Sequence, residues 1–196
     1  MSSAAPPDDL AALSLADIAR LAEAKKLPPV ENWNPPHCGD SAMRIARDGI
    51  WYHEGRPIAR PAMVRLFSTI LRREPDGSHV LVTPVEKLTI EVEDAPFVAV
   101  EVKSEGEGKT RDLAFRLNQG EMVVAGPDHP LRLGAARAGA PGVRLSAPRP
   151  YLNVRGGLEA LISRPVFYEL AELAITEGAE PQGLWSGGVF FLLAVP

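Results

Sequence analysis

Apolar residues form two similar helical stripes in this chain, 104 positions apart. Each stripe follows an Arg-Pro pair, Arg60-Pro61 in the first and Arg164-Pro165 in the second. Proline is tolerated in the first turn of a helix because the N–H group that it lacks would be unpaired there. An i, i+3, i+4, i+7, i+8 spacing is typical of a helix packed on a core. The matching positions are Met63, Leu66, Phe67, Ile70 and Leu71 in the first stripe, and Phe167, Leu170, Ala171, Ala174 and Ile175 in the second. An apolar strand follows each helix, at 79–83 and 189–195, so the pattern predicts an internal duplication of a strand-helix-strand unit.

Strict alternation of apolar and polar residues begins at Lys87. Leu113, Phe115 and Leu117, for example, alternate with polar or small residues. This period of two predicts antiparallel sheets with one solvent-facing side. Asp48-Gly49 predicts a tight hairpin within 43–53, because such a turn requires positive φ angles. We therefore predict an α+β fold.

The order of predicted helices, strands and turns divides the chain into three parts. Residues 1–29 are expected to form a tail and one helix, which starts near Ser14 and ends at Pro28-Pro29. Residues 30–86 form the first repeat unit, in which 31–40 is read as a loop and the helix runs from Pro61 to about Arg73. Residues 87–196 form a larger, β-rich unit that contains the second repeat, with a surface loop over 134–142.

Composition and charge argue against a nucleic-acid-binding, membrane-spanning or secreted protein. A net charge of −4 and a pI near 5.6 argue against a nucleic-acid partner, whose binding depends on basic side chains. No apolar run reaches the roughly 18 residues of a membrane span. The start of the chain carries Asp8 and Asp9 where a secretory signal would be basic. We expect a soluble, cytoplasmic protein that does not act at a membrane.

Several phrases of the sequence resemble the bacterial domain of unknown function 1285 family. They occur in order over most of the chain: ENWNPPHCGD, RIARDGIWYHEGRPIARPAMVRLFSTIL, VLVTPVEK, DAPFV, FRLNQGEMVVAGPDHPLRL and RPVFYEL. The resemblance implies a duplicated core of two small β-rich units, the second superficially similar to a pleckstrin-homology fold. It also implies a cleft between the units that is suspected of holding a nucleotide-like ligand. The family pattern often has an acidic residue where this chain has Ala42, so a carboxylate role there is not expected. The family has no established activity.

Catalytic and metal-binding motifs are weak in this sequence. His37 and Cys38 could supply a thiol nucleophile only with a base from elsewhere, such as His53 or His129. A small thiol in a loop is the simpler interpretation of Cys38. Cys38 is the single cysteine, so a multi-cysteine zinc site and an internal disulfide are excluded. We predict no catalytic residue, no metal site and no cofactor.

A polar ligand surface is the most specific hypothesis for a site. Arg116 and Asn118 have the spacing that places both on one face of a strand, and His129 follows in the segment GPDHP. Lys87 and Arg155 would add positive charge for an anionic group. Either Trp33 or His129 would stack on or hydrogen-bond a base, and Asn118 would read the edge of that base. The alternative is that these side chains belong to a hydrated outer face.

Three functions are compatible with these observations. The first is a non-enzymatic ligand-binding or sensory module in signal transduction, with a nucleotide-like ligand between the two units. The second is a protein-interaction adaptor that binds through a sheet edge or the N-terminal helix. The third, a hydrolase that uses Cys38 or His129, lacks an identifiable triad. The ligand, the protein partner and the oligomeric state are left open.

Overall fold

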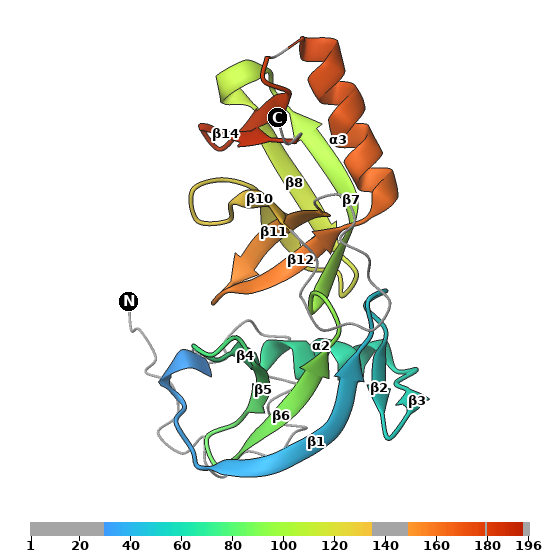
Figure 1. Ribbon diagram of the computed structural model, residues 1–196, viewed down its shortest axis with the longest axis vertical. Coiled ribbons are helices and arrows are strands. Elements are labelled where there is room, and N and C mark those ends of the chain that lie inside the picture. The colour runs from blue at the N-terminus through green and yellow to red at the C-terminus, as the bar shows by residue number, and fades with distance from the viewer. Residues whose placement is uncertain (1–29, 135–148, 179, 194–196) are drawn as a thin grey trace, which may run out of the picture. The chain divides into compact units, whose positions relative to one another are not determined.

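The computed structural model describes residues 30–134, 149–178 and 180–193. The predicted N-terminal helix and most of the predicted loop over 134–142 lie outside the described residues. The described chain forms two compact units, each built around a six-stranded sheet (Figure 1). Unit 1 comprises residues up to Arg44 and Trp51–Glu91, and unit 2 comprises Ile45–Ile50 and Val92–Pro196.

Unit 1 contains the first sheet and one helix. Its elements are the 3-10 helix η2 (Val30–Asn32), β1 (His37–Ile45), β2 (Trp51–His53), β3 (Arg56–Pro57), α2 (Pro61–Thr69), β4 (Leu71–Arg73), β5 (His79–Val82) and β6 (Lys87–Val92). The strand order is β3-β2-β1-β6-β5-β4. β1 and β6 run in the same direction beside each other (Figure 1), and the hydroxyl groups of Ser41 and Thr89 connect them. The core includes Trp51, which stacks on Phe67 of α2 with 6.3 Å between the ring centroids.

Unit 2 contains the second sheet, a helix and a hairpin. Its elements are β7 (Phe97–Glu105), the 3-10 helix η3 (Gly108–Thr110), β8 (Asp112–Leu117), β9 (Met122–Val124), β10 (Leu131–Gly134), β11 (Arg149–Arg155), β12 (Leu158–Ile162), α3 (Arg164–Glu177), β13 (Gly183–Ser186) and β14 (Val189–Leu192). The strand order is β10-β11-β12-β7-β8-β9. β12 pairs with β7 in parallel, so this sheet is not purely antiparallel as the sequence predicted.

The two sheets have the same topology. Adding six to each strand number of the first sheet gives the strand order of the second sheet read from its other edge, β9-β8-β7-β12-β11-β10, and this confirms the predicted internal duplication. The repeat is larger than the predicted strand-helix-strand unit, because each copy is a pair of three-stranded meanders. The helices occupy different places in the copies. α2 lies between the third and fourth strands, whereas α3 follows the sixth strand.

The predicted helix and loop boundaries in unit 1 need correction. α2 ends at Thr69, and 71–73, which the stripe had placed in the helix, form β4. The Thr69 hydroxyl donates to the Leu66 carbonyl at 2.6 Å, and β4 then pairs with β5. The stretch 31–40 is not all loop, because β1 already begins at His37. Apolar residues at a helix end can equally well begin a buried strand, so periodicity alone could not place this boundary.

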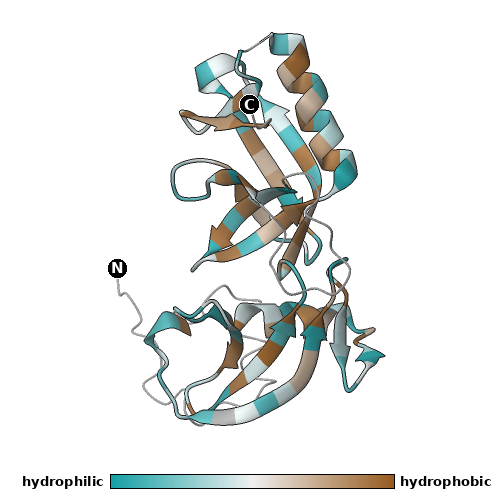
Figure 2. Ribbon diagram, viewed as in Figure 1, coloured by the Kyte–Doolittle hydropathy of each residue, from teal (hydrophilic) through white to brown (hydrophobic). Residues whose placement is uncertain are grey.

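The core of unit 2 lies on the apolar side of its sheet. Leu113, Phe115 and Leu117 are fully buried, as the alternation predicted, and apolar residues line β8 and part of α3 (Figure 2). Ser186 holds the β13–β14 hairpin to this sheet. Its buried hydroxyl accepts from the Leu113 N–H and donates to the Ala125 carbonyl.

Candidate functional site

The six predicted ligand residues are divided between the two units. Trp33 and Lys87 belong to unit 1, and Arg116, Asn118, His129 and Arg155 belong to unit 2. The residues of each unit are therefore described separately.

In unit 1, both predicted residues have partners. Trp33 is buried, and its carbonyl accepts a 2.6 Å hydrogen bond from Arg72. Arg72 also pairs with Glu74, and the Lys87 ammonium lies 3.5 Å from the same carboxylate. Glu74 thus balances two cations, Arg72 and Lys87, and the Trp33 ring is packed in the interior.

In unit 2, the two arginines form ion pairs on the surface. Arg116 on β8 pairs with Glu101 on β7, its direct neighbour in the strand register. Arg155, at the end of β11, binds the Glu121 carboxylate at 2.7 Å, and its guanidinium lies 5.2 Å from the Phe97 ring centroid. These side chains keep about a third to a half of their surface exposed, with 32% for Arg155 and 51% for Arg116. Exposed ion pairs contribute about 0–1 kcal/mol, so an anionic ligand could replace either carboxylate at low cost.

Asn118 binds backbone groups at both ends of its amide. Its Oδ1 accepts from the Val98 N–H at 3.1 Å, and its Nδ2 donates to the Gly49 carbonyl at 3.3 Å. Gly49 has a φ angle of +83°, and a Cβ there would lie 2.5 Å from the Asn118 amide nitrogen. Asn118 therefore fixes the 45–50 turn against the start of β7.

His129 lies in the turn between β9 and β10. Its Nδ1 is 3.2 Å from the Asn153 carbonyl, and the Asn153 N–H donates to the Pro130 carbonyl. The strand directions place the end of β11 and the start of β10 at the same end of the sheet as the end of β8. The structure thus brings Asn118, His129 and Arg155 to one end of the second sheet, and Arg116 lies one residue from the end of β8.

The sequence did not reveal a buried polar cluster on Asp94. The Asp94 carboxylate accepts from the Tyr151 hydroxyl at 2.8 Å and from Arg149 at 2.7 Å, and only 2% of its side chain is exposed. Burial, and then the hydrogen bond to Asp94, raise the pKa of Tyr151 above its ordinary value. Arg132 lies over the Tyr151 ring and forms a bidentate pair with Glu159, which raises the pKa of Arg132. These contacts join β10, β11 and β12 to the segment before β7. No local sequence motif predicts them.

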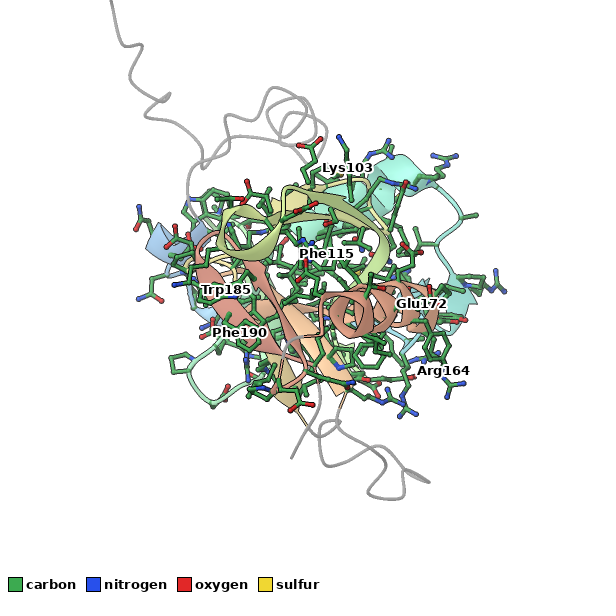
Figure 3. All side chains as sticks on the ribbon, turned by 90° about the horizontal axis from the view of Figure 1, so that it is seen from above. Lys103, Phe115, Arg164, Glu172, Trp185 and Phe190 are labelled. Carbon is green, nitrogen blue, oxygen red and sulfur yellow. The ribbon has the colours of Figure 1, made fainter. Side chains whose placement is uncertain are left out.

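A second feature that the sequence analysis missed is an aromatic surface on the β13–β14 hairpin. Trp185 and Phe190 are direct cross-strand neighbours, with ring centroids 5.3 Å apart. Leu192 shares their side of the hairpin and is 45% exposed. The Lys109 ammonium lies 5.2 Å from the centroid of Trp185. We call Trp185, Phe190 and Leu192 the hairpin face; the first two are labelled in Figure 3. Two short apolar runs with aromatic residues, on either side of the Gly187-Gly188 turn, were the signal that could have found it.

The thiol and metal hypotheses gain no support from the described residues. His37 and Asp40 are exposed on β1, and the Cys38 side chain lies outside the described part of the structure. Among the described residues, no group of three His, Cys, Asp or Glu side chains is placed to hold a metal ion. In the same part of the chain, none of the helices combines the length and apolar character that a membrane crossing requires.

The described residues define a duplicated α+β fold built around two six-stranded sheets. Two family models match consecutive parts of the chain, the N-terminal domain of DUF1285 at residues 28–95 and the C-terminal domain of DUF1285 at residues 96–193. The chain therefore belongs to the DUF1285 family, whose function is unknown, and this confirms the resemblance found in the sequence.

Two solved structures of this family are similar to the chain. A DUF1285 family protein from Silicibacter pomeroyi DSS-3 is 48% identical, with a TM-score of 0.78 over 94% of this chain and 96% of that one. A DUF1285 family protein from Shewanella baltica OS155 is 22% identical, with a TM-score of 0.49 over 67% of this chain and 91% of that one. No curated protein matches the chain. The predicted likeness to a pleckstrin-homology fold stays a prediction.

Proposed function

We propose that this protein is a non-enzymatic interaction module that binds a protein partner through the hairpin face. The single observation that carries the proposal is the half-buried aromatic pair Trp185–Phe190, with the exposed Leu192 beside it. Tryptophan and other aromatic side chains supply much of the binding energy at protein interfaces, because they bury a large area with few rotatable bonds.

The chemistry around the hairpin face indicates what the partner offers. An apolar side chain of the partner would pack against Trp185 and Phe190. Lys109 would contribute its charge at the edge of that contact, so a carboxylate of the partner is favoured there. The hairpin is well fixed for such a role, because the buried Ser186 hydroxyl attaches its inner side to β8 and β9.

Intrinsic fluorescence can report on this surface directly. The chain has three tryptophans, and both Trp33 and Trp51 are buried, whereas Trp185 is half-buried. Acrylamide should therefore quench Trp185 preferentially, and the quenchable fraction should disappear in Trp185→Ala. A bound partner should shield Trp185 from acrylamide.

The decisive experiment compares affinity capture by wild type, Trp185→Ala and Tyr52→Ala. Tyr52 on β2 is a half-buried aromatic residue with the Arg44 guanidinium 4.4 Å from its ring centroid, much as Lys109 lies beside Trp185, and so it serves as the matched control. A partner retained by wild type and Tyr52→Ala would be purified and titrated by calorimetry. We expect Trp185→Ala to weaken its binding about tenfold or more, as for an interface hot spot. Equal binding by folded Trp185→Ala, or no protein retained by wild type above the Trp185→Ala background, contradicts the proposal.

A nucleotide-like ligand is the second candidate function. The observation that favours it is the gathering of Arg155, Asn118 and His129 at one end of the second sheet, with Arg116 nearby. In this proposal the phosphates replace the exposed carboxylates of Glu101 and Glu121 as partners of the two arginines. Roles for Trp33 and Lys87 of unit 1 stay predictions.

A thermal-shift comparison with ATP, GTP, NAD and inorganic phosphate tests this candidate. Stabilisation that is seen with wild type should be lost in Arg155→Ala and Arg116→Ala. Lys103→Ala is the control, since Lys103 also forms an exposed ion pair, with Glu105 at the other end of β7. Stabilisation by a nucleotide that survives both arginine substitutions, or absence of stabilisation by any of the four compounds, would contradict it.

A further inference from the structure

The outer side of α3 carries a row of side chains that the core does not use. Val166, Leu170 and Ala174 face the core and are buried. A second row, at 4-3-4 spacing, consists of Arg164, Tyr168, Ala171 and Ile175. Tyr168 is 62% exposed and Ile175 is 63% exposed. We call this second row the α3 seam.

The spacing of the α3 seam is that of the contact positions of a helix pair. Residues four and three apart lie on one side of a helix and form the a and d positions at which two helices meet. Single exposed apolar residues are ordinary on a protein surface. Tyr168 and Ile175, however, are seven positions apart, which is about two helical turns, with the small Ala171 between them. The seam therefore has the shape of an unpartnered helix contact.

We propose that the α3 seam binds the α3 seam of a second copy of this chain, with the two helices antiparallel. A two-fold axis near Glu169 and Leu170 would place Tyr168 against Ala171 of the second copy, and Ile175 against the aliphatic part of Arg164. Each large side chain then meets a small or flexible one. In such an isologous contact every pairing occurs twice, so the seam is complementary to itself.

Charge determines that the pair is antiparallel. Within the described part of the chain, neither Arg164 nor Glu172 has an ion-pair partner, and both project from α3 (Figure 3). The antiparallel arrangement places each Arg164 beside Ile175 and Glu172 of the other copy. A parallel arrangement would bring the two Arg164 side chains and the two positive helix ends together.

The size of the contact sets the strength of association. α3 has 14 residues, which corresponds to a length of about 21 Å at 1.5 Å per residue. A single helix pair of this length buries less than the roughly 1,200 Å² of a standard stable interface. We therefore expect a reversible dimer with a dissociation constant on the order of tens of micromolar.

Sedimentation velocity on the full chain, from about 1 µM to about 500 µM, tests the proposal, since this range spans the expected dissociation constant. Wild type should pass from monomer to dimer. Arg164→Glu and Glu172→Arg should each weaken the association at least fivefold, and the double variant R164E/E172R should restore it. Arg60→Glu, at the Arg-Pro start of α2, is the matched control and should leave the dimer unchanged.

Two outcomes would overturn the proposal. The first is a wild type that stays monomeric over the whole range. The second is a dimer that the single charge reversals do not weaken, or that the double variant fails to restore. The experiment is independent of the proposed function, because the hairpin face belongs to β13 and β14 and the α3 seam belongs to α3, with no residue in common.

Discussion

Single residues in this protein carry conformational and electrostatic costs that the surrounding structure offsets. Ala42 is the clearest backbone case, with a φ angle of +54° in the middle of β1. The left-handed region is unfavourable for residues with a Cβ atom. The Ala42 N–H donates to Asp40 Oδ1 at 2.9 Å, so a local hydrogen bond supports the unusual backbone.

Replacing Ala42 by glycine should therefore stabilise the protein. Relief of the left-handed conformation is worth about 1–2 kcal/mol, and the greater freedom of glycine in the unfolded chain offsets about 0.4–1 kcal/mol of it. We expect a net gain of about 0.5–1 kcal/mol in urea unfolding. Ala62→Gly, at an exposed position of α2, should instead cost about 0.5–1 kcal/mol. Changes of the same sign in the two variants would show that the φ angle of Ala42 is not the cause.

The buried Tyr151 predicts a loss of stability at high pH. Its folded pKa is raised by burial and by Asp94, whereas an unfolded tyrosine ionises near pH 10. The stabilising contribution is therefore complete below about pH 10 and decreases as the pH rises beyond it, because only the unfolded state then releases the proton. Tyr151→Phe removes this dependence.

The comparison of wild type with Tyr151→Phe isolates this effect from other titrating groups. At pH 7 the variant should be about 1–3 kcal/mol less stable, because the buried Asp94 carboxylate loses a donor. Urea unfolding from pH 7 to pH 11 should show this difference shrinking above about pH 10. A constant difference over that range would mean that Tyr151 ionises alike in both states.

At the scale of the element, α3 shows what helical periodicity can and cannot decide. The stripe predicted Leu170 and Ala174 in the core, and both are buried. It also placed Phe167 and Ile175 there, but the core-facing residue of the first turn is Val166, and Ile175 is exposed. A helix with apolar residues on two sides gives two overlapping stripes, and only tertiary packing selects one.

This difference leads to a test of the core face. Leu170→Ala should cost about 2–5 kcal/mol through lost burial and a residual cavity. Ile175→Ala, on the exposed side, should stay within about 0.5 kcal/mol of wild type. Thermal and urea unfolding should be measured at low protein concentration, where self-association does not contribute. Similar losses in both variants would contradict the packing of α3 described above.

The strands also show what a sequence pattern can and cannot predict. Alternation predicted the strands from Lys87 to Val124, because one side of each faces solvent. It did not predict β10, which has only four residues and lies at the sheet edge. The ion pairs of Arg116 and Arg155 were also beyond prediction. The Arg116–Glu101 pair depends on which residue lies opposite in the register, and an irregularity between Ala99 and Glu101 shifts that register. The Arg155–Glu121 pair joins the end of β11 to the turn before β9, which are far apart in the sequence and are not neighbours in the sheet.

At the scale of the whole molecule, the sequence predicted the duplication but not its extent. The helical stripes that suggested it belong to helices at different places in the two copies. The true repeat is the strand order, which depends on long-range pairing that no local pattern records. The two units are also not continuous segments of the chain. The turn 45–50 belongs to unit 2, although the strands on either side of it belong mainly to unit 1.

This arrangement predicts that unit 2 is weaker without the early turn. A fragment that begins at Val92 lacks Gly49, which packs on Val98 and Asn118. We expect the fragment to unfold at a lower temperature than unit 2 in the full chain. Asn118→Ala should cost about 1–3 kcal/mol in the full chain, where two backbone groups lose a partner, and less in the fragment. Equal losses in both would contradict this role of the turn.

The 45–50 turn is synthesised before the residue that it binds in unit 2. Gly49 leaves the ribosome well before Asn118, its partner 69 residues later. During that interval the bonds available to the turn are its own and those of Glu93, whose carboxylate accepts from the Arg47 N–H at 3.1 Å. Within the turn, the Asp48 carboxylate accepts from the Ile50 N–H at 3.0 Å, and Gly49 adopts the positive φ angle that the turn requires. If Asp48 or Gly49 were replaced, the 45–50 turn would not be preformed when Asn118 is synthesised. Folding of unit 2 would then depend more on chaperones.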